Sequence, residues 1–218
     1  MAWLIRGSTR HKWHNPLIAP NLYCKSREDI IAAQRPLFAE AHIYKETYGF
    51  LPFGIYAHGR AIEDRFWPIS GYFINDFEKL PRLIGLAGFY LVPEIWYEII
   101  EKFEPGVHQF KHIPLFRCDG SSVEDRFYAV NICQAHNNVA DRERSTAPIK
   151  DYPDRKNVFI KTSSTAKVFF CKKAIGNYHM WIPLEILTYN MALSNKLYRA
   201  LLELGGMETI DAIEIEEV

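Results

Sequence analysis

The 218-residue chain is 48% hydrophobic and 24% charged, a composition typical of globular proteins and not of disordered ones. It contains 26 lysine and arginine residues and 26 aspartate and glutamate residues, a balance that argues against binding nucleic acid through overall charge. No run of about 18 apolar residues could span a membrane, and the first residues lack the pattern of a secretory signal. We therefore expect a cytoplasmic protein with no membrane partner.

The first 84 residues have the least regular pattern. Residues 2–5 and 22–25 resemble short strands, and a helix is expected to start at Arg27. From residue 47 to residue 86 the chain is rich in aromatic side chains and repeatedly interrupted by glycine and proline, which predicts turns and irregular packing. We interpret residues 1–84 as an N-terminal α+β subdomain.

The pattern becomes clearer after Gly85. Residues 88–92 are an apolar run typical of a strand. Residues 94–103 place apolar and charged side chains on opposite faces of a helix, which the Pro-Gly pair at residues 105–106 ends. Ser194 is expected to cap a second helix. Further strands are predicted at residues 107–116, 126–134, 158–161, 167–172, 178–182 and 210–215.

The order of these elements predicts the fold class. Strands follow one another through turns such as those at residues 119–120 and 176–177, and only a few helices lie between them. We expect an α+β fold with a mainly antiparallel sheet, a few packed helices and an irregular, aromatic-rich N-terminal part. Residues 85–218 are interpreted as a C-terminal α+β domain.

Short motifs that position catalytic or cofactor-binding groups are absent from the sequence. It contains no G-x-G-x-x-G, no G-x-x-x-x-G-K-[ST], no G-x-S-x-G and no H-E-x-x-H. His108 and His112 lie on a predicted strand, where four residues span about 13 Å, too far for both to bind one metal ion. The four cysteines are far apart and form no C-x-x-C pair. We therefore expect neither a metal nor another cofactor.

A densely polar segment at residues 136–145 is the one place where the sequence suggests catalysis. Its histidine, Asp141 and Ser145 could supply the general base and nucleophile of a hydrolase or metal-dependent enzyme, together with His179 or His112. Polar residues between strands also form hydrogen-bonded turns, in which an aspartate fixes the turn. Both interpretations stay open from the sequence.

A third interpretation rests on positive charge. The segment that begins with Arg142 and ends with Lys173 contains nine basic residues and three acidic ones, with aromatic residues close to its lysines. This pattern is compatible with a surface that binds nucleic acid. A strand with an exposed end explains it better, so no direct nucleic-acid partner is expected.

The order of several segments resembles that of a known family. These segments are GFYLVPEIWYEIIEKF at residues 88–103, FYAVNICQ at residues 127–134 followed by NNVADRERS, then KVFFCKK, HMWIP and the closing LSNKLYRALLELGG. Together they resemble a family of bacterial immunity proteins encoded beside polymorphic and secreted toxin genes. The resemblance covers about residues 85–215, and Pro93 stands where the family has a serine.

The resemblance implies a small cytoplasmic protein that is not an enzyme. Such a protein binds and neutralises a cognate toxin, for example a nuclease effector, by blocking its active site or the path of its substrate. Because a nuclease cleft is basic, an inhibitor can present acidic residues to it. The candidate toxin-binding residues are the acidic residues near the end of the chain, Glu208, Asp211, Glu214, Glu216 and Glu217. Asp141 and Ser145 match the family motif and are interpreted as structural.

Overall fold

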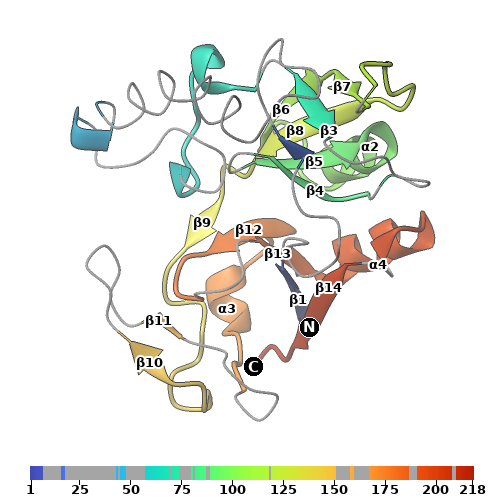
Figure 1. Cartoon of the computed structure of the whole chain (residues 1–218). Helices are drawn as coiled ribbons and strands as arrows, with labels where there is room; N and C mark the ends of the chain where they lie inside the picture. Colours follow the sequence, from blue (N-terminus) through green and yellow to red (C-terminus); the bar gives the residue numbers. More distant parts are fainter. Residues whose placement is uncertain are drawn as a thin grey trace.

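The computed structural model describes residues 1–6, 16–17, 43, 45–47, 57–68, 70–73, 80, 82–86, 89–117, 119–150, 158–159, 167–186, 191–207 and 210–218. A four-stranded sheet lies in the upper half of Figure 1 and a five-stranded sheet in the lower half. The short strand β9 (Ala135–His136) lies between the two halves and belongs to the lower sheet.

The lower sheet has the strand order β14-β1-β13-β12-β9. Its other strands are β14 (Asp211–Ile215), β1 (Ala2–Arg6), β13 (Met191–Ser194) and β12 (Met180–Pro183). The upper sheet has the order β4-β5-β8-β6. Its strands are β4 (Ile84–Leu86), β5 (Phe89–Pro93), β8 (Phe127–Asn131) and β6 (Gln109–Ile113).

Two smaller sheets and four helical segments complete the described elements. The small sheets contain β2 (Pro16–Leu17), β3 (Gly71–Phe73) and β7 (Leu115–Phe116) in one case, and β10 (Ile149–Lys150) and β11 (Val158–Phe159) in the other. The helical segments are η2 (Asp64–Phe66), α2 (Glu94–Phe103), α3 (Lys172–Ile175) and α4 (Asn195–Glu203). Most strand pairs are antiparallel, and β9 with β12 and β3 with β7 are parallel. The predicted α+β class is confirmed.

Most predicted elements of the second half are confirmed with shifted ends. The helix predicted at residues 94–103 is α2. Ser194 caps α4, because its hydroxyl oxygen accepts the backbone N–H of Leu197 over 3.2 Å. The strand predicted at residues 107–116 is divided into β6 and β7 at Pro114, which has no N–H to donate to a neighbouring strand.

The strand predicted at residues 167–172 is wrong. Within the described residues this segment pairs only at Phe170, which forms isolated bridges with Ala140 on one side and Glu217 on the other. Its backbone groups therefore bond to two different neighbours, and Lys172 already starts α3. The alternation of apolar residues in the sequence reflects their burial in the core and not a place in a sheet.

Only some of the predictions for the N-terminal part fall on residues that the structure describes. The strand predicted at residues 2–5 is confirmed as β1. The strand predicted at residues 22–25 and the helix predicted from Arg27 lie outside the described residues. None of the helices in the described part is long and apolar enough to cross a membrane.

One apolar layer joins the two larger sheets. It fills the space between them, and α2 and α4 both contribute to it, so the helices pack against each other as well as against the sheets. Burial of this layer from water is the main force that holds the upper and lower halves together. Its central members are Tyr90, Val92, Trp96, Ile100, Val130, Met180, Met191, Leu193, Leu197 and Leu201.

The first strand of the chain lies inside the lower sheet, between two strands from the end of the chain. Ala2 pairs with Ser194 of β13 on one side and with Ile215 of β14 on the other. The side chains of Ala2, Leu4 and Ile5 are fully buried. The lower sheet is therefore completed by residues from the predicted N-terminal subdomain, while the boundary at residue 84 itself stays a prediction.

A fragment of residues 85–218 tests whether the second half folds alone. Because it lacks β1, β14 loses its neighbour in the sheet and the apolar residues around Leu4 become exposed. We expect circular dichroism to show no cooperative thermal transition for the fragment, in contrast to the full chain. A cooperative transition in the fragment would mean that the lower sheet closes without β1.

Candidate functional site

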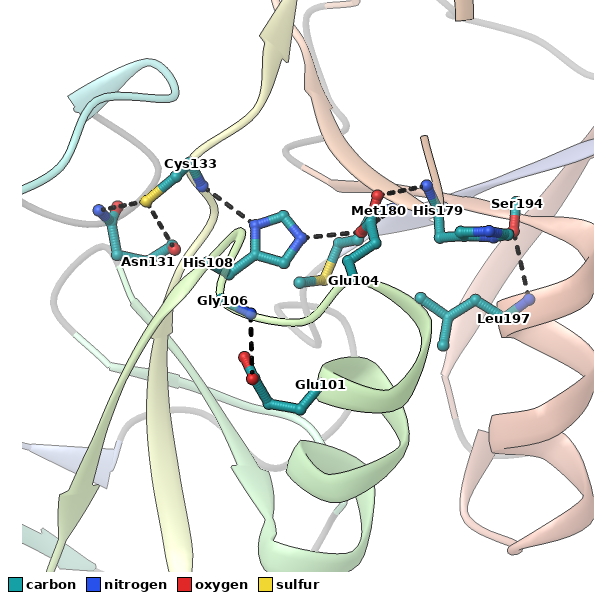
Figure 2. Close-up of polar contacts among 10 residues, drawn as sticks. All are labelled: Glu101, Glu104, Gly106, His108, Asn131, Cys133, His179, Met180, Ser194 and Leu197. Carbon is teal, nitrogen blue, oxygen red and sulfur yellow. Dashed lines mark hydrogen bonds and ion pairs between the residues drawn. The ribbon is translucent and has the colours of Figure 1, made fainter. Parts of the chain in front are cut away.

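A buried carboxylate lies at the junction of the two halves. Glu104 follows the last turn of α2, and its side chain accepts the backbone N–H groups of His179 over 2.7 Å and Met180 over 2.9 Å, at the start of β12 (Figure 2). The amide of Gln134, with its nitrogen directed at Glu104, donates over 3.2 Å. Hydrogen bonds from the lower half thus end on a residue of the upper half.

His108 completes the set of donors around Glu104. Its ring is buried, and Nε2 lies 2.9 Å from a carboxylate oxygen of Glu104. The other ring nitrogen, Nδ1, accepts the backbone N–H of Cys133 over 3.2 Å (Figure 2). With Nδ1 as the acceptor for Cys133, the ring directs its Nε2 side at the carboxylate of Glu104.

These contacts determine the charge of Glu104. Burial alone raises the pKa of a carboxyl group, but the hydrogen bonds from His108, His179 and Met180 stabilise the ionised form more strongly. The pKa of Glu104 is therefore lowered from its ordinary value. At neutral pH the junction contains a carboxylate whose oxygens are occupied by donors, so this group is not available as a general base.

A serine and a histidine lie next to this network without forming a catalytic triad. His179 Nδ1 and Ser194 Oγ are 2.8 Å apart, but the hydroxyl oxygen of Ser194 also caps α4 (Figure 2). Glu104 contacts the backbone N–H of His179 and not its ring, whereas a triad requires the carboxylate to orient the ring. The arrangement fixes the start of α4 and of β12.

The family-motif turn is built on Asp141. Its carboxylate oxygen accepts the backbone N–H groups of Glu143 over 3.0 Å and Arg144 over 3.1 Å, and its carbonyl accepts the N–H of Ser145 over 3.0 Å. The hydroxyl oxygen of Ser145 in turn accepts the N–H of Phe169 over 3.0 Å. Asp141 and Ser145 thus close the turn and attach it to the segment that contains Phe170, which supports their interpretation as structural.

A second buried carboxylate holds the start of this turn. Glu185 accepts the backbone N–H of Asn138 over 3.1 Å and that of Ala140, and Arg142 lies 4.0 Å away. Burial raises the pKa of Glu185, and these hydrogen bonds and the Arg142 charge offset only part of that effect. Arg144 similarly approaches Asp141 at 3.8 Å. Two of the basic residues proposed for nucleic-acid binding are therefore next to carboxylates.

His136 is not part of the hydrogen-bonded turn around Asp141 and Ser145. No hydrogen bond among the described residues connects it to Asp141 or Ser145, and its ring contacts Tyr178 at a centroid distance of 4.3 Å. Burial lowers the pKa of His136, which favours a neutral ring. Within the described part of the chain there is also no group of three histidine, cysteine, aspartate or glutamate residues that could hold a metal ion.

The predicted acidic site is only partly assembled on one surface. Glu208 lies outside the described residues. Asp211 and Glu214 belong to β14 but point to opposite faces of the sheet, since Asp211 pairs with Arg6 and Glu214 with Trp3. Glu216 is exposed, and Glu217 pairs with the amino group of Met1 over 2.9 Å.

The segment around Phe170 connects the acidic end of the chain to the Asp141 turn. The N–H of Phe170 donates to the carbonyl of Glu216 over 2.9 Å, and the N–H of Asp141 donates to the carbonyl of Phe169 over 2.8 Å. The acidic end of the chain and the Asp141 turn, which the sequence suggested separately, are therefore both neighbours of the segment around Phe170.

An aromatic side chain next to β14 was not predicted as part of the site. The indole of Trp3 stacks on the ring of Tyr198 with centroids 3.9 Å apart, and its N–H donates to the side-chain oxygen of Asn195 over 3.1 Å. The guanidinium of Arg199 lies 6.0 Å from the indole centroid. Trp3 is only partly buried, and Glu214 is its cross-strand neighbour. No sequence pattern connects Trp3 to α4, which lies about 190 residues later.

Replacing Glu104 by Gln tests the junction. A Gln amide directs hydrogens at groups that already donate, so the free energy of unfolding at pH 7 should fall by about 2–3 kcal/mol. Because the folded pKa is lowered, the stabilisation is present above the ordinary glutamate pKa of about 4.3 and is lost as pH falls through the folded pKa. The free energy of unfolding, measured by urea titration, should therefore change less between pH 7 and pH 3 for Glu104→Gln than for the wild type. Glu98→Gln, at an exposed position of α2, should behave like the wild type.

Replacing Asp141 by Ala separates a turn role from a catalytic one. Loss of the acceptor for Glu143 and Arg144 should reduce the free energy of unfolding by about 1 kcal/mol and speed hydrogen exchange at those two amides. Unchanged stability would contradict the structural role of Asp141.

Comparison with known proteins extends the similarity beyond the second half. The sequence pattern of an immunity protein family, Imm11, matches residues 26–217. The match starts well before Gly85, so much of the predicted N-terminal subdomain is part of the family's pattern. It also contains the Asp141 turn and four strands of the lower sheet, all but β1. No curated protein matches the chain. The chain belongs to the immunity protein family Imm11.

Proposed function

We propose that this protein is a cytoplasmic immunity protein that binds a cognate toxin and blocks its active site or the path of its substrate. Membership of an immunity family implies a toxin as the partner. The observation that favours a particular surface is the position of β14, the outermost strand of the lower sheet, with exposed glutamates in and after it (Figure 1).

The charge of this surface favours a basic partner. Glu214 and Glu216 are exposed, and residues 207–218 contain no lysine or arginine. A toxin that acts on nucleic acid has a basic cleft for the phosphates, so acidic side chains placed there would exclude the substrate. This surface therefore supports a nuclease toxin more than a toxin with an acidic or neutral cleft.

Trp3 supplies a second property of a binding surface. Tryptophan, tyrosine and arginine are the residues that most often dominate binding energy in protein interfaces. The stacking of Trp3 on Tyr198 and its hydrogen bond to Asn195 hold the indole in one orientation before a partner arrives. Less conformational entropy is then lost on binding.

Charge reversal at this surface tests the proposal. We expect the wild type, co-expressed with the toxic domain encoded beside its gene, to restore growth, and the variant with Glu214→Lys and Glu216→Lys to fail. Calorimetry with an inactive toxin should show about tenfold weaker binding for each reversed charge.

A matched control carries Glu98→Lys and Glu124→Lys, two exposed acids of the upper half with the same change in net charge. This control should protect as well as the wild type. If both double variants lose protection equally, overall charge and not the β14 surface determines binding. If the toxic domain does not bind the wild-type protein, the proposed function is wrong.

A further inference from the structure

We propose that Arg199 binds a carboxylate of the toxin, while Glu214, on the other side of Trp3, binds one of its basic groups. This inference rests on the proposed function and concerns the charges that the partner must carry. It adds a basic residue to the acidic ones, so the toxin surface that fits has both charges in a fixed order.

Trp3 lies between the two charged side chains. Glu214 is its cross-strand neighbour on β14, which borders β1 on one side, so both side chains are on the same face of the sheet. Arg199 belongs to α4, which packs on β1 and on β13, the neighbour on the other side (Figure 1). Glu214 and Arg199 therefore flank the indole.

Neither charge has a counter-ion in the described part of the chain. The guanidinium of Arg199 is exposed and lies 6.0 Å from the centroid of the Trp3 indole, close to the limit of a cation–π contact. Glu203 stands one turn later on α4, at a spacing that allows an ion pair, but none forms with Arg199. The exposed carboxylate of Glu214 is likewise unpaired among these residues. Both groups can therefore pair with charges of a partner.

Trp3 also fixes the separation of the two charges. Its indole stacks on Tyr198, the residue before Arg199, and donates its N–H to Asn195 at the start of the same helix. The backbone of Trp3 is paired with Glu214 in the sheet. The helix and the strand are therefore joined through one side chain, and a partner meets two charges at a fixed distance. Like charges brought together by the wrong order repel, so the order contributes to specificity.

The chemistry of these side chains defines the toxin surface that fits. A guanidinium is planar and can bond to both oxygens of a carboxylate, so the group over α4 is an aspartate or glutamate side chain. The group over β14 is a lysine or arginine, because it meets Glu214 and the exposed Glu216. Tryptophan, tyrosine and arginine, which meet here in Trp3, Tyr198 and Arg199, are the residue types that dominate binding energy in interfaces.

Charge reversal at Arg199 separates this surface from a purely acidic one. The probe is the toxic domain encoded beside the gene, in an inactive form, titrated calorimetrically into the full chain. Arg199→Glu should weaken binding at least about tenfold, although it makes the protein more acidic. Arg199→Lys keeps the charge without the planar group and should weaken binding about threefold. Lys196→Glu is the matched control, because Lys196 is exposed on the same helix, and its affinity should stay within about twofold of the wild type.

The outcomes distinguish this inference from the proposed function. If the toxin binds the wild type and binds Arg199→Glu equally or more tightly, the contact with Arg199 is wrong while the proposed function stands. Circular dichroism checks folding, and Arg199→Gln, which adds no negative charge to α4, should also weaken binding.

A second copy of this chain is the other possible occupant, since Arg199 of one copy could meet Glu214 of another. Light scattering of the free protein should show a monomer. A dimer that Arg199→Glu dissociates would assign the surface to self-association and overturn the inference. If the toxic domain does not bind the wild-type chain, the proposed function fails and the contact with Arg199 fails with it.

Discussion

The relative position of the two sheets depends on the carboxylate of Glu104. It stands at the end of α2 and accepts hydrogen bonds from His179 and Met180 where β12 starts, from Gln134 and from His108. A carboxylate can be buried at acceptable cost only when its oxygens are paired, and here the donors come from both halves of the molecule. The apolar layer between the sheets provides most of the attraction, but it is not directional. Glu104 determines the register in which α2 and β12 meet.

The periodic parts of the sequence were sufficient to predict the elements that carry one apolar face. The helices α2 and α4 were predicted from their helical spacing, β5 from its continuous apolar run, and β8 and β14 from their strand-like composition. Pairing between distant strands leaves no such local signal. The sequence therefore predicted β1 as a strand but not its place between β13 and β14.

The candidate site was harder to predict because a glutamate can either be exposed to solvent or be buried and hydrogen-bonded. Exposed glutamates and buried, hydrogen-bonded glutamates look alike in a sequence, so Glu104 and Glu185 were not singled out. The sequence did contain a signal for Glu185, because it is the one charged residue in the apolar stretch at residues 180–187. The acidic end of the chain was predicted as one surface, whereas strand geometry divides Asp211 and Glu214 between two faces.

The position of β1 has a consequence for the order of synthesis. Trp3 and Asn195, which bond to each other, are separated by 192 positions. Because β1 is translated before β13 and β14, it cannot pair with them until both have been made, and contacts over such a distance form slowly. A nascent chain in which β14 has not yet been translated lacks the closed lower sheet, so a cell gains a working copy only after β14 has been made and paired. Protection against a toxin made at the same moment would depend on copies that are already complete.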